Sequence, residues 1–297
     1  MSFDKEVTRG VITKGIGGFY YVDIGKETVE CRARGKFRKD AETPMVGDKV
    51  EITLNSDGSG SVARILPRKN TLVRPEVANM DMMVLVAAVK SPAPDYALLD
   101  RLLAIAESKG IESIICLNKT DLSDDTQAQE FAKTYKKAGY TVIEASAATG
   151  KGADEVRRAI KGKTACFTGL SGVGKSSLIK RITGIDLKCG SVSKIQRGKH
   201  TTRHTELMPY KNGFVFDTPG FSRLDADCLF AKDLHLYFPE IRAYEGQCRF
   251  RTCNHRGESG CAVKKAQEDG LIAESRLNNY VELFNRLNEI KNWQRKD

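Results

Sequence analysis

No apolar run in the sequence is long enough to cross a membrane. The longest, Met80 to Val89, covers ten residues and contains Asp81, whereas a spanning helix needs about 20 apolar residues. The N-terminus has no apolar stretch behind a basic one, so we expect no secretory signal. Internal repeats and low-complexity tracts are absent too, and 40% of the residues are hydrophobic. These features predict a folded cytoplasmic protein, and we expect a monomer without a membrane partner.

The chain also lacks a charged tail. Its formal net charge is +10, and the excess of lysine and arginine is spread over the N-terminal, central and C-terminal parts. Such a surface permits a polyanionic partner without requiring one, because ordinary basic proteins have the same balance. Charge alone therefore leaves nucleic-acid binding open.

A disulfide framework is missing as well. Five of the eight cysteines are scattered, several of them within apolar strands: Cys31, Cys116, Cys166, Cys189 and Cys228. A reducing compartment disfavours disulfides, so we interpret these five as small buried side chains. The other three cysteines cluster around one histidine and require a separate explanation.

Residues 1–68 have the pattern of a small β-barrel. Short apolar runs are separated by glycines, and Asp57-Gly58 lies between two segments of alternating apolar and polar residues, which indicates a hairpin. Several short strands in this length fit an OB-type barrel, with another small barrel as the alternative. Residues 69–79, which contain Pro75 and several charges, are expected to form a linker.

Residues 80–230 alternate between strand and helix patterns. The expected strands are Met82–Val89, Ser113–Leu117, Thr141–Glu144, Thr164–Thr168 and Gly213–Phe216. The expected helices are Ala97–Ser108, Thr126–Ala138, Ala153–Ile160 and Lys175–Ile182. This alternation predicts a mainly parallel sheet with helices on both faces. Residues 231–297 are mainly helical in pattern, and the apolar stripe from Ala273 to Trp293 is typical of a helix that packs on its own domain.

A phosphate-binding loop follows the strand expected at Thr164–Thr168. The segment Gly169-Leu170-Ser171-Gly172-Val173-Gly174-Lys175-Ser176 matches G-x-x-x-x-G-K-[ST] at every defined position. Its glycines let backbone N–H groups point at phosphate oxygens, and the N-terminus of the next helix adds partial positive charge. We expect Lys175 to reach the β- and γ-phosphates, Ser176 to bind Mg²⁺, and Ser177 to belong to the same nucleotide site; the loop alone does not identify the base.

The identity of the base is predicted from a motif upstream of this loop. Asn118-Lys119-Thr120-Asp121 follows an apolar strand, and ligands bind at the carboxyl ends of strands in open α/β sheets. Guanine presents N1–H and N2–H₂ side by side, so one carboxylate, that of Asp121, accepts from both, whereas adenine has no such pair. Asn118 is expected to join neighbouring loops and to contact the base, and the stem of Lys119 to cover its face.

A second base-contacting loop is indicated by Ser146-Ala147. These residues follow the strand expected at Thr141–Glu144, one strand–helix unit after Asp121. They resemble the loop of GTPases whose backbone N–H meets guanine O6. Their place in the chain, more than their identity, supports this interpretation.

A sensor of metal and γ-phosphate is predicted after the last strand of this part. Asp217-Thr218-Pro219-Gly220 has the pattern D-x-x-G. We expect Asp217 to hold Mg²⁺ through water and the Gly220 N–H to contact the γ-phosphate. In the polar segment from Gly198 to His204, Thr202, in preference to Thr201, is expected to complete the Mg²⁺ shell.

No glutamine follows this motif. Where many GTPases have one to orient the attacking water, the chain has Phe221, so another group must do so. His200 is the candidate, because a neutral imidazole can hydrogen-bond a water at pH 7. The alternatives are that His200 is only a solvent-exposed switch histidine, that His204 acts instead, or that a partner supplies the group. We expect slow intrinsic hydrolysis that a partner raises.

The order of these motifs is permuted. Ordinary GTPases present the phosphate loop, the switch threonine, D-x-x-G, N-K-x-D and then the serine-alanine loop, whereas here the last two come first. The cyclic order is the same, and termini that lie close together make such a cut possible without changing the sheet. Gly220 now leads directly into the C-terminal segment, so we expect the nucleotide state to reach that segment.

Cys248, Cys253, His255 and Cys261 provide three thiolates and one imidazole within 14 residues. This is the ligand set of a closed, structural Zn²⁺ site, with no open position for catalysis. Five basic residues surround it: Arg249, Arg251, Arg256, Lys264 and Lys265. A zinc knuckle with a basic rim suits a phosphate backbone, and a purely structural knob is the alternative.

Together, the small barrel, the permuted motifs and the cysteine–histidine cluster resemble the ribosome small subunit-dependent GTPase A family (RsgA or YjeQ) over essentially the whole chain. The resemblance implies an OB-fold N-terminal domain, rRNA binding, late maturation of the small ribosomal subunit, and GTP hydrolysis stimulated by that subunit. It also implies that the switch histidine, His200, is catalytic; Lys175 and Thr202 complete our predicted catalytic set. The family's run of three threonines is Thr201-Thr202-Arg203 here. Either Thr201 or Thr202 can therefore be the Mg²⁺ ligand.

Two other functions compete with a ribosome-coupled GTPase. One is an RNA-binding module whose nucleotide site controls affinity while hydrolysis is incidental, which the missing glutamine favours and the intact phosphate and Mg²⁺ residues disfavour. The other is a P-loop kinase or ATPase, which the guanine motif at Asn118–Asp121 disfavours. A comparison of GTP and ATP binding separates a kinase or ATPase from the ribosome-coupled GTPase and from the GTP-regulated RNA-binding module.

Overall fold

The computed structural model describes residues 7–33, 43–73, 76–122, 125–185, 205–217 and 228–290 of the chain. These residues belong to two compact units. The first has the bounds Met1–Asp81, Ile160–Cys166 and Lys188–Pro219, and the second Met82–Ala159, Phe167–Leu187 and Gly220–Asp297. Each unit therefore draws on separate parts of the sequence.

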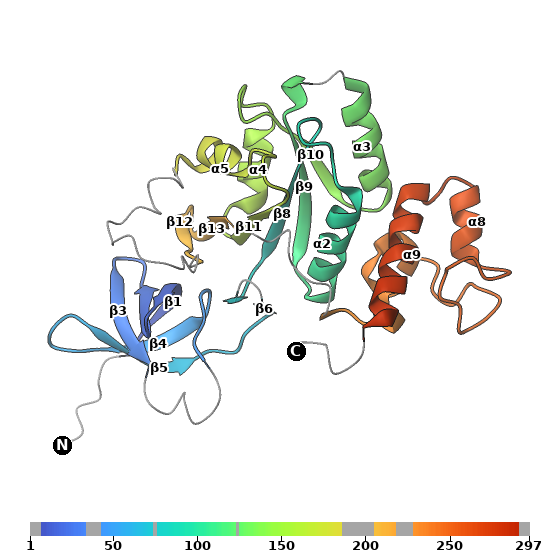
Figure 1. Ribbon diagram of the computed structural model, residues 1–297. Helices are drawn as coiled ribbons and strands as arrows, with labels where there is room; N and C mark the ends of the chain where they lie inside the picture. The colour runs from blue at the N-terminus through green and yellow to red at the C-terminus, as the bar shows by residue number, and fades with distance from the viewer. Residues whose placement is uncertain are drawn as a thin grey trace. The chain divides into compact units, whose positions relative to one another are not determined.

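In the described part of the N-terminal segment, the strands close into a five-stranded barrel (Figure 1). They are β1 (Val7–Ile16), β2 (Phe19–Asp23), β3 (Thr28–Ala33), β4 (Lys49–Leu54) and β5 (Gly60–Ile65), in the order β1-β2-β3-β5-β4, and β1 also pairs with β4. Only β3 and β5 run parallel among these neighbours. Ile12, Val22 and Val50 are fully buried inside. The expected OB-type barrel is confirmed.

The predicted hairpin at Asp57-Gly58 joins β4 to β5. Gly58 has a φ of +80°, a conformation that glycine adopts without strain. The Asn55 N–H donates to the Ser59 carbonyl oxygen at 2.8 Å, and Asp57 Oδ1 accepts from the Ser59 N–H at 2.9 Å. The turn thus sets the register in which β4 and β5 pair antiparallel.

Residues 69–79, expected as a linker, contain a short hairpin of β6 (Thr71–Val73) and β7 (Glu76–Ala78). The Ala78 N–H donates to the Val46 carbonyl oxygen at 2.9 Å, and the buried Asn79 side chain donates to the Gly47 carbonyl oxygen at 3.0 Å. A Cβ on Gly47 would lie 2.1 Å from the Ala78 carbonyl oxygen. Close backbone contacts, which a sequence pattern does not reveal, hold this hairpin on the barrel.

The described strands from residue 82 onward form a six-stranded sheet in the order β10-β9-β8-β11-β13-β12 (Figure 1). They are β8 (Met82–Ala88), β9 (Glu112–Asn118), β10 (Thr141–Glu144), β11 (Thr164–Thr168), β12 (Met208–Tyr210) and β13 (Gly213–Asp217). The β8–β9 and β9–β10 pairs are parallel, and β12 is antiparallel to β13. Every residue of β8 is buried, as in a strand covered on both faces. The predicted mainly parallel sheet is confirmed, with an antiparallel strand at one edge.

The helices of this part are α2 (Tyr96–Ser108), α3 (Asp125–Lys137), α4 (Ala153–Ile160) and α5 (Lys175–Thr183). Helix α2 begins where Asp95 Oδ1 accepts a hydrogen bond from the Leu98 N–H at 2.9 Å, which satisfies a backbone donor of the first turn. Its buried side, including Leu102 and Ile105, contacts β8 and β9. Helix α5 ends at Gly184, whose φ of +79° is typical of a helix C-terminus.

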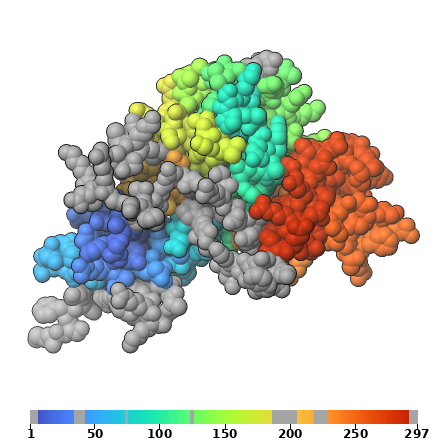
Figure 2. Space-filling model, viewed as in Figure 1, coloured from blue at the N-terminus to red at the C-terminus, as the bar shows by residue number. Residues whose placement is uncertain are grey.

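The C-terminal segment is helical around the cysteine cluster. Its elements are the 3₁₀ helix η4 (Ala231–Tyr237), α7 (Pro239–Arg242), α8 (Ala262–Glu268) and α9 (Glu274–Glu289). The apolar side of α9 contributes Leu277, Leu283 and Leu287 to the core, whereas Val281 is only partly buried. Helix α9 packs beside α2 (Figure 2). Trp293 lies outside the described residues, and no helix within them combines the length and apolar character of a membrane span.

A buried charged cluster holds α9 against α2. Arg276, only 1% exposed, donates to Asp100 at 2.7 Å and to Glu240 at 2.6 Å. Asp100 also accepts hydrogen bonds from the Tyr135 hydroxyl at 2.9 Å and from Asn279 at 2.6 Å. Carboxylates so deeply buried require partners of this kind. The C-terminal helix is thereby tied to α2 and α3.

Candidate nucleotide site and metal centre

The loop expected to hold phosphates connects β11 to α5. Gly169, Gly172 and Gly174 have φ values of +142°, +82° and +90°, which favour glycine. A Cβ at Gly169 would lie 2.1 Å from the Val86 carbonyl oxygen, and one at Gly174 would lie 2.5 Å from the side-chain nitrogen of Asn118. Close neighbours as well as backbone conformation therefore require glycine at these two positions.

Lys175 stands at the start of α5, where the helix N-terminus faces this loop. Its ammonium group donates to the carbonyl oxygens of Gly169 at 2.9 Å and Leu170 at 2.8 Å. Phosphate oxygens would compete for these donors, because charged acceptors form stronger hydrogen bonds than carbonyls. Of the other loop residues Val173 is buried, and four are exposed: Ser171, Gly172, Ser176 and Ser177.

Asn118 joins the loops of the predicted nucleotide site. Its side chain is 1% exposed and donates to the Val173 carbonyl oxygen, in the phosphate loop, at 2.8 Å. Its Oδ1 accepts from the Ala147 N–H, in the serine-alanine loop, at 3.0 Å. The structure thus brings together motifs that lie far apart in the sequence.

The base-recognition loop turns sharply after Asn118. Lys119 has a φ of +63°, and its ammonium group donates to the Ser91 carbonyl oxygen. Thr120 donates both its N–H and its hydroxyl to the Ala145 carbonyl oxygen, at 3.2 and 3.1 Å. Asp121 lies in the 3₁₀ helix η1 (Thr120–Leu122) and is exposed. Its carboxylate is therefore accessible to a ligand.

The serine-alanine loop is fixed from both sides. The buried Ser146 accepts a hydrogen bond at Oγ from the Thr149 N–H at 3.1 Å. From α5, Arg181 donates to the carbonyl oxygens of Ala147 at 3.1 Å and Ala148 at 2.6 Å. A backbone N–H of this loop is expected to meet guanine O6, and the Ala147 N–H already donates to Asn118 Oδ1.

Asp217 ends β13 in the first unit. Burial raises the pKa of the Cys166 thiol, and the Asp217 carboxylate raises it further, so these side chains are neighbours. Five other predicted switch residues lie outside the described residues: His200, Thr201, Thr202, His204 and Gly220. The Mg²⁺ shell of Ser176, Thr202 and Asp217, and the role of His200, therefore stay predictions.

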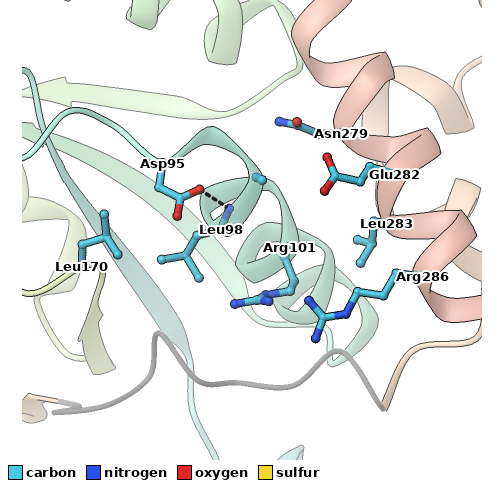
Figure 3. Close-up of a pocket in the computed structure, with 9 residues that line it drawn as sticks. Asp95, Leu98, Arg101, Leu170, Asn279, Glu282, Leu283 and Arg286 are labelled. Atoms are coloured by element: carbon cyan, nitrogen blue, oxygen red, sulfur yellow. Dashed lines mark hydrogen bonds between the residues drawn. The ribbon is translucent and has the colours of Figure 1, made fainter. Parts of the chain in front are cut away.

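A cavity of about 210 Å³ lies where α2, the phosphate loop and α9 meet (Figure 3). Its lining includes Leu98 and Arg101 of α2, Leu170 of the loop and Arg286 of α9. The residues of the base-recognition motif do not line it, so it is separate from the predicted base site. Sequence patterns do not reveal it, because its walls come from distant segments.

Cys248, Cys253, His255 and Cys261 converge before α8. Their ligand atoms all lie within 4.8 Å of one another, and the three sulfurs are 3.5, 3.7 and 3.6 Å from His255 Nδ1. Bonds of about 2.3 Å to sulfur and about 2.0–2.1 Å to nitrogen around a tetrahedral Zn²⁺ give nitrogen–sulfur separations of about 3.6 Å. The nitrogen–sulfur distances therefore suit one tetrahedral ion.

Burial sets the ionisation of this cluster when no metal is bound. Burial and the neighbouring cysteines raise the pKa of Cys253 to about 12, so without a metal its thiol is protonated at neutral pH. Burial lowers the pKa of His255, which favours the neutral imidazole that a metal binds. A bound metal ion would displace the thiol protons, and the N–H of Ala262, which donates to Cys248 Sγ at 3.3 Å, would stabilise the thiolate.

An open groove of about 640 Å³ lies beside the cluster. Lys232, His235, Phe250 and Arg251 are among its lining residues. Phe250 is 50% exposed, and the Arg249 guanidinium lies 5.4 Å from its ring centroid. Exposed aromatic rings beside cations form surfaces on which unpaired nucleobases stack. The sequence indicates the basic rim but not the exposed ring, since phenylalanine is more often buried.

The scattered cysteines that the structure describes lie apart from this cluster. Cys31, Cys116 and Cys166 are buried. Burial raises the pKa of Cys31 to about 11 and that of Cys116 to about 12, so both remain thiols at neutral pH. These three are the small buried side chains that we expected. Cys228 is only partly buried, so the expectation is wrong for that residue, and Cys189 lies outside the described residues.

Comparison with known families covers the barrel and the sheet. Residues 9–62 match the RsgA N-terminal domain, and residues 65–227 match the RsgA GTPase. Two relatives named small ribosomal subunit biogenesis GTPase RsgA are each 43% identical to this chain. The one from Caldanaerobacter subterraneus subsp. tengcongensis matches over 96% of this chain and 97% of its own, and the one from Alkaliphilus metalliredigens over 97% and 100%.

Two solved structures have the same fold over nearly the whole chain. YjeQ from Thermotoga maritima is 36% identical with a TM-score of 0.85, covering 96% of this chain and 100% of that one. YloQ, described as a circularly permuted GTPase, is 35% identical with a TM-score of 0.81, covering 98% of each chain. The permuted motif order agrees with that description. The chain belongs to the RsgA GTPase family.

Proposed function

We propose that the chain is a GTP hydrolase that acts late in maturation of the small ribosomal subunit, and that this subunit stimulates its hydrolysis. Membership of the RsgA GTPase family makes the chain a GTPase. The names of its relatives, which refer to small-subunit biogenesis, support the biological role. Its partners would be the small subunit with its rRNA, and GTP and GDP. We assign it to the cytoplasm, where subunits mature, as a monomer.

The observation that carries the nucleotide assignment is the position of Asn118. Its one side chain holds the phosphate loop at Val173 and the serine-alanine loop at Ala147. The base-recognition, phosphate and serine-alanine motifs therefore surround one position, although they are spread over residues 118–177. Exposed Asp121 then recognises the guanine edge, and a kinase or ATPase would have no use for such a carboxylate.

We assign the phosphates of GTP to Gly169–Ser176 together with Ser177. Lys175 would move from the carbonyls that it now contacts to the β- and γ-phosphates. Ser176, Thr202 and Asp217 would hold Mg²⁺, which when bound neutralises charge on the phosphate oxygens. The Gly220 N–H would contact the γ-phosphate.

We propose that His200 positions the attacking water, because Phe221 cannot do so. His204 and a group of the ribosomal partner are the rival positioners. Positioning that depends on a docked partner gives slow intrinsic turnover, and Lys175 and Thr202 would serve catalysis only once the switch segment is ordered.

We propose that the cysteine–histidine cluster holds one structural Zn²⁺ through Cys248, Cys253, His255 and Cys261. All four donors are protein atoms, so no position is left for substrate. The adjacent groove with Phe250 and Arg251 would contact unpaired rRNA. We retain the division into a barrel (1–68), linker (69–79), GTPase domain (80–230) and zinc domain (231–297) as part of this proposal.

The decisive experiment measures GTP hydrolysis by the zinc-loaded protein alone, with small ribosomal subunits, and with large subunits as control. We expect stimulation by small subunits only, from a slow basal rate to the order of 1–10 per second. A basal rate that is already this high would contradict partner-dependent water positioning.

Hydrolysis that small subunits leave unchanged would favour the second function, a GTP-regulated RNA-binding protein in which hydrolysis is incidental. Retention of the chain on small subunits in a nucleotide-dependent way, without stimulated turnover, identifies that case. If stimulation is found, His200→Ala should abolish it while GTP affinity stays the same. Loss of affinity instead would place His200 in binding.

A further inference from the structure

The hairpin of β12 and β13 lies in a special place in the sequence. It follows the segment with the switch threonines and ends at Asp217, so it connects both elements that are predicted to respond to the γ-phosphate. Its two-residue turn, Lys211-Asn212, has positive φ at both positions, which gives a short, stiff hairpin. The turn thus fixes how β12 pairs with β13.

The start of this hairpin is bonded to the barrel. The Leu207 N–H donates to the Thr13 carbonyl oxygen at 2.8 Å, and Lys14 and Glu206 form an antiparallel bridge. Lys14 Nζ also lies 3.0 Å from Glu206 Oε2. Leu207 is 2% exposed, so this contact excludes water at its centre. Backbone pairing of this kind constrains direction as well as distance.

Strand β1 is shaped to make this contact. Its pairing with β4 stops at Val11, opposite Lys49, while its pairing with β2 continues to Ile16. The register against β2 shifts between Ile12 and Lys14, and such a bulge bends the strand that contains it. One edge of β1 is thereby open beyond residue 12 and accepts Glu206 and Leu207.

The other end of the hairpin is fixed as well. The Phe214 N–H donates to the Lys163 carbonyl oxygen at 3.1 Å, and the Gly162 N–H donates to that of Lys211 at 3.2 Å. A Cβ on Gly213 would lie 2.3 Å from the Lys163 carbonyl oxygen. The hairpin is therefore held at its turn by the start of β11 and at its entrance by the barrel.

From these contacts we infer that the barrel positions the switch hairpin, with Lys14 and Glu206 as positioning residues for GTP hydrolysis. The inference rests on the proposed function, because it gives the barrel a part in the same reaction. A partner that binds the barrel would then change turnover by moving the hairpin entrance. The barrel would act on catalysis without touching the nucleotide.

The test is a charge swap in the full-length, zinc-loaded protein. Lys14→Glu and Glu206→Lys should each lower kcat about three- to fivefold, the scale of one exposed ion pair, with KM unchanged. The double variant, in which the charges are exchanged, should restore kcat. The matched control swaps Arg9 and Glu51, an ion pair of 3.2 Å within the barrel, and should leave kcat unaltered.

Three outcomes overturn the inference: unchanged kcat in both single variants, a loss that the double swap does not restore, or an equal loss in the control pair. A second readout is independent of turnover. Hydrogen exchange at the Leu207 amide should differ between the GDP-bound protein and the protein bound to a non-hydrolysable GTP analogue, and equal exchange counts against the inference. Absence of hydrolysis by the unmodified chain would instead contradict the proposed function, and the exchange experiment would still test the bridge.

Discussion

At the residue scale, we predict that nucleotide specificity depends on the carboxylate of Asp121, which is exposed beside the buried Asn118. In Asp121→Asn an amide N–H₂ would face the donors of guanine. Two hydrogen bonds to a charged acceptor are lost, at about 1.5–3 kcal/mol each, so GTP affinity should fall by at least about 100-fold. Fluorescent GTP and ATP analogues measure it, with Glu130→Gln on α3 as control. An unchanged preference for GTP over ATP would remove Asp121 from base recognition.

Phe250 is the second residue whose chemistry can be tested alone. In Phe250→Ala, binding of single-stranded rRNA oligonucleotides should weaken by about 1–3 kcal/mol, the value of one stacked base. Phe250→Tyr should retain binding, because its ring still stacks. Anisotropy titrations at fixed salt measure the effect. The control is Phe230→Ala, since that ring is also exposed, at 44%, but does not line the groove. Equal losses in both variants would speak against stacking in the groove.

At the scale of elements, the attachment of α9 to α2 depends on Arg276. Arg276→Met would leave Asp100 and Glu240 buried without their cation, which should lower the free energy of unfolding by about 3–5 kcal/mol. Denaturant titrations measure this change. Arg242→Met is the matched control, because Arg242 pairs at 3.5 Å with Glu107, which lies in α2 like Asp100, but is half exposed. Exposed ion pairs contribute about 0–1 kcal/mol. Similar effects of both variants would refute the special role of the buried cluster.

At the scale of the whole molecule, zinc should stabilise one domain without entering the reaction. Chelation should lower the melting temperature by about 5 °C or more, because the cluster also holds Asn254, whose carbonyl oxygen accepts from the Tyr280 hydroxyl of α9 at 3.0 Å. GTP affinity should persist, since no residue of the nucleotide-binding loops is among the four metal ligands. Calorimetry and GTP binding check both points, and Cys261→Ala should reproduce them. Melting that chelation leaves unaltered would exclude a structural metal.

Much of this protein follows from local chemistry that a sequence displays. Gly169 and Gly174 have positive φ values, which favour glycine, and the phosphate-loop motif contains both glycines. The order of strands and helices follows from periodicity, and the cysteine–histidine cluster from spacing within one loop. Short-range geometry leaves such marks because neighbouring residues alone must satisfy it.

Contacts between distant segments leave no such mark. Arg276 lies in an amphipathic helix and has the pattern of a surface residue, yet it is buried against Asp100, whose carboxylate comes from another helix. The bridge of Leu207 to Thr13 uses backbone groups that every residue carries. The exposure of Phe250 and the cavity beside Leu170 likewise depend on which surfaces remain uncovered. Burial and backbone pairing arise only when the chain has folded, so tertiary packing, rather than residue order, settles them.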